Sequence, residues 1–137
     1  MNTKRLALAS LAVFVVFTAL DGIIHGVLLD NLYHQTSSIW RPEGEIQHNM
    51  WLMWLGSLIF APTFVLIYIK GYEANKGRLG QGVRYGLIVG ILLSAPQSLG
   101  WYAVLPIPGV LAFSWFVAGV VESLAAGTAV GLIWRPA

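Results

Sequence analysis

Four long apolar segments divide this chain of 137 residues, and they constrain its fold more than any other feature of the sequence. A helix needs about 20 mostly apolar residues to cross the roughly 30 Å hydrocarbon layer of a bilayer. Segments that meet this requirement cover residues 6–29, 51–69, 85–104 and 110–134. Because they leave little chain for a soluble unit, we expect an all-α bundle of four transmembrane helices that forms a single membrane domain over residues 1–137.

The composition agrees with a membrane environment and excludes several classes of protein. Hydrophobic residues make up 57% of the chain and charged residues 10%, whereas about 25% of residues are charged in a typical soluble domain. The eight Lys and Arg residues are not gathered into a patch, so we expect no binding of nucleic acid. Because the chain has no cysteine, disulfides, thiolate metal sites and cysteine nucleophiles are excluded.

The first apolar segment could also be a signal peptide, because Lys4 and Arg5 precede it. Residues 17–20, however, lack the small-x-small pattern of a cleavage site, and apolar residues continue past Asp21. We therefore expect this segment to be retained as a transmembrane helix.

The positively charged residues predict how the helices are oriented in the membrane. Cytoplasmic loops carry an excess of Lys and Arg. Arg41 stands alone on one side of the predicted membrane. The other side holds seven cationic residues: Lys4, Arg5, Lys70, Lys76, Arg78, Arg84 and Arg135. We therefore expect both termini to lie in the cytoplasm, the segment 70–84 to be a solvated inner turn, and residues 30–50 to form an outer loop.

Small residues indicate where the predicted helices pack, because helices in lipid associate through close backbone contact. They recur at every fourth position in the last segment and as pairs in the first and third: Gly119, Ser123, Gly127 and Gly131; Gly22 and Gly26; Gly86 and Gly90. For the long row we favour packing within the chain, with a seam between copies of the chain as the alternative. Val130 lies outside this row, so we expect it to tolerate replacement by leucine.

Ionisable and polar residues inside the apolar segments are the candidates for function, because charge within a membrane is expensive. Asp21 and His25 are four residues apart and share a helix face, and Glu122 falls near the middle of the last segment. The third segment adds Ser94, Gln97, Ser98 and Trp101. These groups predict a polar pocket for a ligand or protons that opens outward beneath residues 30–50. The alternative is a hydrogen-bond network that only locks the helices, for example from Asp21 through His25 to Gln97.

Three histidines are candidate metal ligands: His25, His34 and His48. They lack the fixed spacing of a known metal motif. A haem held by two histidines would need both at matched depth on facing helices, and only His25 lies clearly within a predicted helix. A haem or metal cofactor is therefore possible but not favoured.

Several stretches form a recognisable pattern: residues 21–29 (DGIIHGVLL), Tyr33, residues 40–43 (WRPE) and the last segment, rich in Trp and Phe. The pattern resembles a family of small bacterial four-helix membrane proteins to which no activity is attached. The resemblance covers nearly the whole chain. It implies the four-helix fold and a location in the bacterial inner membrane, and it transfers no activity.

Together these features favour a binding protein or an accessory subunit, acting on a lipophilic ligand or within a larger membrane complex. One alternative is a proton- or cation-coupled small transporter that works as a homo-oligomer, with Glu122 and Asp21 as exchangeable carboxylates. Another is an intramembrane enzyme that uses Asp21 and His25 as an acid–base pair on a lipid-like substrate. Of these classes, the enzyme is the less favoured. The expected partners are the lipid bilayer and either a larger complex or a second copy of the chain.

Overall fold

The computed structural model describes residues 3–134, and over this range it contains helices and no strands. The elements follow one another as α1 (Thr3–Ile23), the π-helical turn η1 (Ile24–Leu28), α2 (Asp30–Gln35), the 3-10 turn η2 (Ser37–Ile39), α3 (Glu43–Lys70), α4 (Arg78–Val104) and α5 (Gly109–Ile133). Four helical stretches are long and apolar enough to cross a membrane: α1 with η1, α3, α4 and α5. The predicted all-α fold with four membrane-length helices is therefore confirmed.

Helices α3 and α4 begin well before the apolar segments predicted for them. Helix α3 starts at Glu43 rather than at residue 51, and α4 starts at Arg78 rather than at residue 85. The added turns are polar, so hydropathy does not detect them, and Glu43 is an acidic residue that suits a helix N-terminus. Most of the expected outer loop, residues 30–50, is consequently helical, in α2, η2 and the start of α3.

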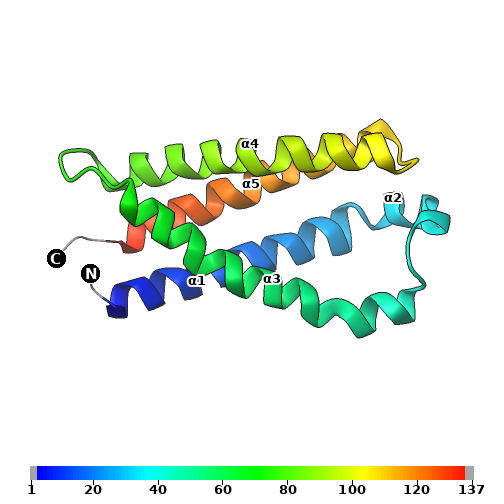
Figure 1. Ribbon diagram of the computed structural model, residues 1–137, viewed down its shortest axis with the longest axis horizontal. Helices are drawn as coiled ribbons and strands as arrows, with labels where there is room; N and C mark the ends of the chain where they lie inside the picture. Colours follow the sequence, from blue (N-terminus) through cyan, green and yellow to red (C-terminus); the bar gives the residue numbers. More distant parts are fainter. Residues whose placement is uncertain (1–2, 135–137) are drawn as a thin grey trace.

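The long helices are arranged so that α1 packs against both α3 and α5, while α5 packs along α4 (Figure 1). The first turn of α1, the last turn of α5 and residues 71–77 lie at one end of the bundle, which we call the terminal end (Figure 1). The opposite end, which we call the α2 end, holds α2 and residues 105–108. The larger apolar core contains Val13, Phe64, Val65, Ala126 and Val130, among others.

Helices α4 and α5 approach each other through small residues. A Cβ atom added to Gly127 would lie 2.7 Å from Cα of Gly86, and one added to Gly90 would lie 2.9 Å from Cα of Val120. Such distances leave no room for any side chain. The predicted row of small residues in α5 faces α4 within the same chain; it consists of Gly119, Ser123, Gly127 and Gly131. On α4, this row is faced by Gly82, Gly86, Gly90 and Ser94.

Three expectations about packing need correction. An added Cβ at Gly22 or at Gly26 would meet no atom within 4 Å, so these glycines do not form a seam within the described chain. Val130 is fully buried in the core, so a larger leucine there would be crowded rather than tolerated. Gly82, expected in the solvated inner turn, lies inside α4 instead.

The surface of the bundle is largely apolar. Val27, Leu92, Leu99 and Phe113 are each more than half exposed, at 69%, 66%, 67% and 66%. In water such a surface would drive aggregation, whereas lipid solvates it without cost. The exposed side chains and the helix lengths together fit a multi-pass membrane protein.

The turn between α3 and α4 is held in place by Gln81, which is buried. The Gln81 amide nitrogen donates to the carbonyl oxygens of Glu73 and Lys76, both at 2.9 Å, and its oxygen accepts from the Glu73 N–H at 2.8 Å. The Glu73 carboxylate lies 2.6 Å from Lys76 Nζ and 3.2 Å from Arg84. The Lys76 hydrogen bond lowers the pKa of Glu73 below its ordinary value. The turn is therefore an ordered structure as well as a group of solvated charges.

Helices α3 and α4 contact each other near the terminal end. The Tyr85 hydroxyl donates to the Phe64 carbonyl at 2.6 Å, and the Tyr68 hydroxyl donates to the Arg78 carbonyl at 3.2 Å. Towards the α2 end the two helices diverge (Figure 1). Pro62 lies inside α3, where it removes one backbone hydrogen bond and favours bending. This divergence positions the site described next.

Candidate functional site

A cavity of about 680 Å³ lies among the four long helices, in the half of the bundle towards the α2 end. The seven residues that the sequence singled out for a polar pocket all line it: Asp21, His25, Ser94, Gln97, Ser98, Trp101 and Glu122. The remaining walls are mostly apolar or aromatic and include Phe17, Met53, Phe60, Leu93 and Trp115. The cavity therefore joins a polar region to a wide hydrophobic surface.

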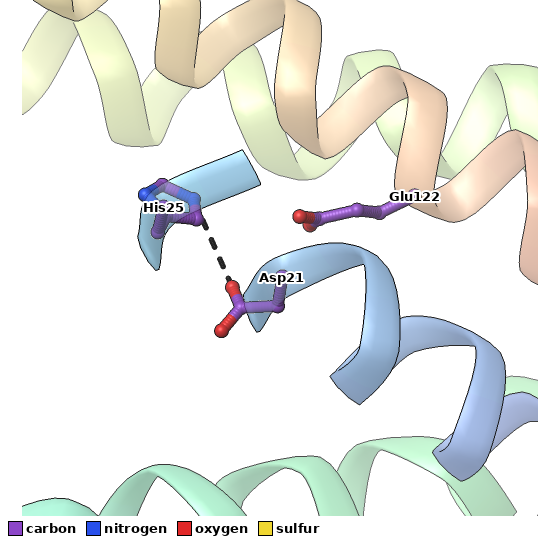
Figure 2. Close-up of side chains that lie close together, drawn as sticks. All are labelled: Asp21, His25 and Glu122. Carbon is purple, nitrogen blue, oxygen red and sulfur yellow. Dashed lines mark ion pairs between the residues drawn. The ribbon is translucent and has the colours of Figure 1, made fainter. Parts of the chain in front are cut away.

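Three ionisable side chains meet in this polar region. Asp21 and His25 come from the end of α1 and the start of η1, and Glu122 comes from the middle of α5 (Figure 2). One ligand-capable atom of each residue lies within 4.8 Å of those of the other two. His25 Nε2 is 3.7 Å from Asp21 Oδ1, the pair joined by the dashed line in Figure 2. We call these three residues the triad.

A π-helical turn, η1, begins between Asp21 and His25. The N–H of Leu29 donates to the carbonyl of Ile24 at 2.9 Å, which spans five residues instead of the usual four. Single π turns inside α-helices are rare and occur often at functional sites. Here the turn carries His25, whose ring lies beside both Asp21 and the following α2.

Glu122 is the most enclosed member of the triad. The residue is 3% exposed, and its Oε1 atom is buried without a hydrogen-bond partner among the described residues. The Oγ atoms of Ser10 and Thr18 are also buried and unpaired, but they are neutral hydroxyls. No lysine or arginine is among the residues that line the cavity. The two carboxylates are thus brought together with His25 and without a lysine or arginine among the residues that line the cavity.

Tyr33 on α2 contacts the triad on the side of the α2 end. Its hydroxyl lies 2.6 Å from His25 Nδ1 and accepts a hydrogen bond from Trp115 Nε1 at 2.7 Å. Because an indole nitrogen can only donate, the Tyr33 oxygen must accept from Trp115, and its own proton can go to His25. Burial raises the pKa of Tyr33 above its ordinary value; the hydrogen bond from Trp115 opposes this rise, and the charges of Asp21 and Glu122 add to it. The hydroxyl therefore remains a donor at neutral pH.

An aromatic cluster covers this connection. The Trp40 ring stands edge-on to Tyr33 at 5.7 Å between centroids and lies 6.0 Å from Trp115. Trp40 Nε1 donates to the Thr36 hydroxyl at 2.9 Å, which holds the indole over α2. The sequence reasoning did not include Tyr33 or Trp115 in the pocket. Their pairing spans 82 positions, so no local spacing signals it, although Tyr33 belongs to the pattern that carried the family resemblance.

The hydrogen-bond network suggested from the sequence differs from the observed one. His25 bonds Tyr33 rather than Gln97, and the side chain of Gln97 has no hydrogen-bond partner among the described residues. The Ser98 hydroxyl donates to the Ser94 carbonyl of its own helix at 2.7 Å. Gln97, Ser94 and Ser98 thus line the cavity without connecting the helices through hydrogen bonds.

The three histidines proposed as metal ligands are not brought together. His34 is exposed on α2 and pairs with Asp30 at 3.4 Å, while His48 is exposed near the start of α3. The residues that line the cavity include His25 and no other histidine. The structure therefore does not join His25, His34 and His48 in one site, because the His34 and His48 side chains are exposed and do not line the cavity.

Comparison with protein-family models, with curated proteins and with solved structures finds no match for this chain. The resemblance to small bacterial four-helix membrane proteins is therefore left without independent support. The function has to be inferred from the geometry of the cavity and the triad.

Proposed function

We propose that this protein binds a lipophilic ligand within the membrane, in the cavity between α3 and α4, and that the triad receives the ligand's polar group. The observation that carries this proposal is the cavity itself. Its volume of about 680 Å³ falls within the roughly 300–1,000 Å³ of typical small-molecule sites. Such sites combine apolar walls with a few polar groups that orient the ligand, and this cavity has both.

The position of the cavity supports entry from the bilayer. Helices α3 and α4 are joined by Tyr85 and Tyr68 near the terminal end and diverge beyond them (Figure 1). A hydrophobic molecule could pass between the diverging helices directly from lipid. On the side of α2, the cavity wall includes Tyr33, whose ring packs against Trp40.

We place the protein in a bacterial inner membrane as a single domain, with both termini in the cytoplasm. The distribution of positive charge supports this orientation. Seven cationic residues were assigned to the cytoplasmic side, and the structure describes six of them. These six lie at or near the terminal end: Lys4, Arg5, Lys70, Lys76, Arg78 and Arg84. The seventh, Arg135, lies outside the described residues. The protein would act as a binding subunit, alone or in a larger membrane complex.

A cavity-filling substitution tests the proposal. The protein would be extracted in mild detergent, and the small molecules that leave the membrane with it would be identified by mass spectrometry. Gly56 lines the cavity and has no atom within 4 Å of an added Cβ, so Gly56→Phe fills the space with little clash. Gly100→Phe is the matched control, because Gly100 is equally open but does not line the cavity.

We expect wild type and Gly100→Phe to retain the same lipophilic compound and Gly56→Phe to lose it. Equal retention by all three proteins, or no retained compound in the wild type, would contradict the proposal. Recovery of a partner protein without any small molecule would instead favour an accessory subunit.

A further inference from the structure

We propose that Asp21, His25 and Glu122 bind a divalent transition-metal ion. This inference goes beyond the proposed function, because the ion would be held by the three side chains whether or not the cavity contains a lipophilic ligand. It also replaces the earlier candidate set of three histidines with one histidine and two carboxylates, drawn from two helices that are far apart in sequence.

The geometry of the triad is suitable for an ion. The three ligand-capable atoms lie within 4.8 Å of one another. First-row metals bind imidazole nitrogen and carboxylate oxygen at about 2.0–2.2 Å, so each atom would have to move inward by less than about 1 Å. Rotations of the Asp21 and Glu122 side chains can provide such movements without a change in the helices.

The charges of the triad call for a cation. Asp21 and Glu122 lie in two helical stretches that are long and apolar enough to cross a membrane, and no lysine or arginine lines the cavity. An uncompensated charge in that environment is costly. A divalent ion would neutralise both carboxylates at once and would also satisfy Glu122 Oε1, which is buried without a partner and directed towards the other two residues (Figure 2).

The surroundings of His25 resemble those of a metal-bound histidine. Such a histidine almost always hydrogen-bonds through its second ring nitrogen, which fixes the ring orientation. In this protein Nε2 faces Asp21, and Nδ1 lies 2.6 Å from the Tyr33 hydroxyl. With a metal on Nε2, Nδ1 would carry the proton and donate it to the Tyr33 oxygen, which can accept from Trp115 as well. Tyr33 and Trp115 would then act as positioning residues.

The donor atoms narrow the choice of ion. Calcium and magnesium prefer ligand sets made entirely of oxygen, whereas an imidazole with two carboxylates suits Mn²⁺, Fe²⁺ or Zn²⁺. Three protein ligands also leave at least one coordination position open. That position would face the cavity, where a polar group of a bound molecule could complete it.

Manganese alone is a suitable probe, because its binding can be followed by electron paramagnetic resonance. The full chain, free of affinity tag, would be purified in detergent, stripped with a chelator and titrated with Mn²⁺. We expect one ion per chain. Spin-echo measurements on the wild type should show coupling to a single imidazole nitrogen, a result that does not depend on the folding of any variant.

Variants then assign the ligands. Glu122→Gln and Asp21→Asn preserve size and should each weaken Mn²⁺ binding by at least about tenfold, and Tyr33→Phe should weaken it by about 10–100-fold without removing the nitrogen signal. The chain offers a matched control in Asp30 and His34, an exposed pair with the same four-residue spacing. Asp30→Asn and His34→Gln should leave binding unchanged.

No stoichiometric Mn²⁺ in the wild type, no nitrogen coupling, or a loss of binding in the Asp30 and His34 variants would overturn the metal site. Gly56→Phe separates this outcome from the proposed function, since it should abolish retention of the lipophilic compound while Mn²⁺ still binds. Loss of Mn²⁺ binding in folded Gly56→Phe would contradict an independent metal site.

Discussion

The indole N–H of Trp115 in α5 donates to the hydroxyl of Tyr33 in α2 at 2.7 Å, and the two residues are 82 positions apart. The same hydroxyl lies 2.6 Å from His25 Nδ1. Tyr33 on α2 thus joins η1 and α5 beside the cavity that it lines. The position of α2 over the triad follows from this connection and from the aromatic cluster with Trp40.

The first prediction concerns this connection. Tyr33→Phe leaves the Trp115 and His25 nitrogens without their partner, and Trp115→Phe removes one donor to Tyr33. Each single change should lower the free energy of unfolding by about 1–3 kcal/mol, because a half-buried polar group loses its hydrogen bond. The double variant should lose less than the sum of the two, as measured by thermal unfolding in detergent. Strictly additive losses would show that the two residues are not coupled.

The second prediction is a pH dependence of Tyr33, whose pKa is raised by burial above the ordinary value of 10.0. A group with a raised folded-state pKa contributes stability that is complete below its unfolded pKa and is lost as pH rises through the folded value. We therefore expect the protein to keep this contribution up to pH 10.0 and to lose it above. The ultraviolet difference titration of wild type against Tyr33→Phe reports the ionisation, and tyrosinate formation below pH 10.0 would contradict the assignment.

The third prediction concerns the seam between α4 and α5. Gly127→Ala places a methyl group 2.7 Å from Cα of Gly86, so the helices must separate, at a cost of about 1–3 kcal/mol or more. Gly100→Ala is the control, because its added Cβ meets no atom within 4 Å. The melting temperature should fall for Gly127→Ala and stay equal or rise for Gly100→Ala, since alanine favours helix. Equal melting temperatures would show that the close contact between α4 and α5 does not contribute to stability.

The fourth prediction concerns the turn at residues 71–77. Gln81→Met keeps the side-chain volume but removes the hydrogen bonds to Glu73 and Lys76. The turn should open more often, so limited proteolysis within it should become faster while the rest of the bundle stays resistant. Gln47→Met is the comparison, because Gln47 makes an exposed contact to Glu43 at the other end. Similar cleavage rates in both variants would argue against a structural role of Gln81.

The fifth prediction concerns topology. The chain has no cysteine, so a single introduced cysteine is its sole thiol. Ser37 and Asn75 are both exposed, one near the α2 end and one in the terminal-end turn. A membrane-impermeant thiol reagent should label Ser37→Cys on intact cells. It should label Asn75→Cys only after the cells are permeabilised. The reverse pattern would invert the proposed orientation.

Much of the fold follows from local properties that the sequence expresses directly. The four long helices are predicted by apolar length alone, because a bilayer requires about 20 such residues. The neighbouring positions of Asp21 and His25 follow from helical periodicity. The helical period also places Ser94, Gln97, Ser98 and Trp101 on one face of a helix, and these residues line one cavity. The polar first turns of α3 and α4 escape the same reasoning because hydropathy detects only the apolar part of a helix.

Other features depend on how helices rotate and slide against one another, which no local pattern encodes. Gly22 and Gly127 each belong to a set of small residues spaced four apart, yet of these two only Gly127 faces a neighbouring backbone within the described chain. His34 and His25 are both histidines near an aspartate, yet α2 turns the first outward. The tertiary structure alone decides that Glu122 meets Asp21 and His25, because packing through small residues sets the depth and rotation of α5. It also decides that α3 leaves α4 beyond Tyr85, and this divergence opens the cavity in which the triad lies.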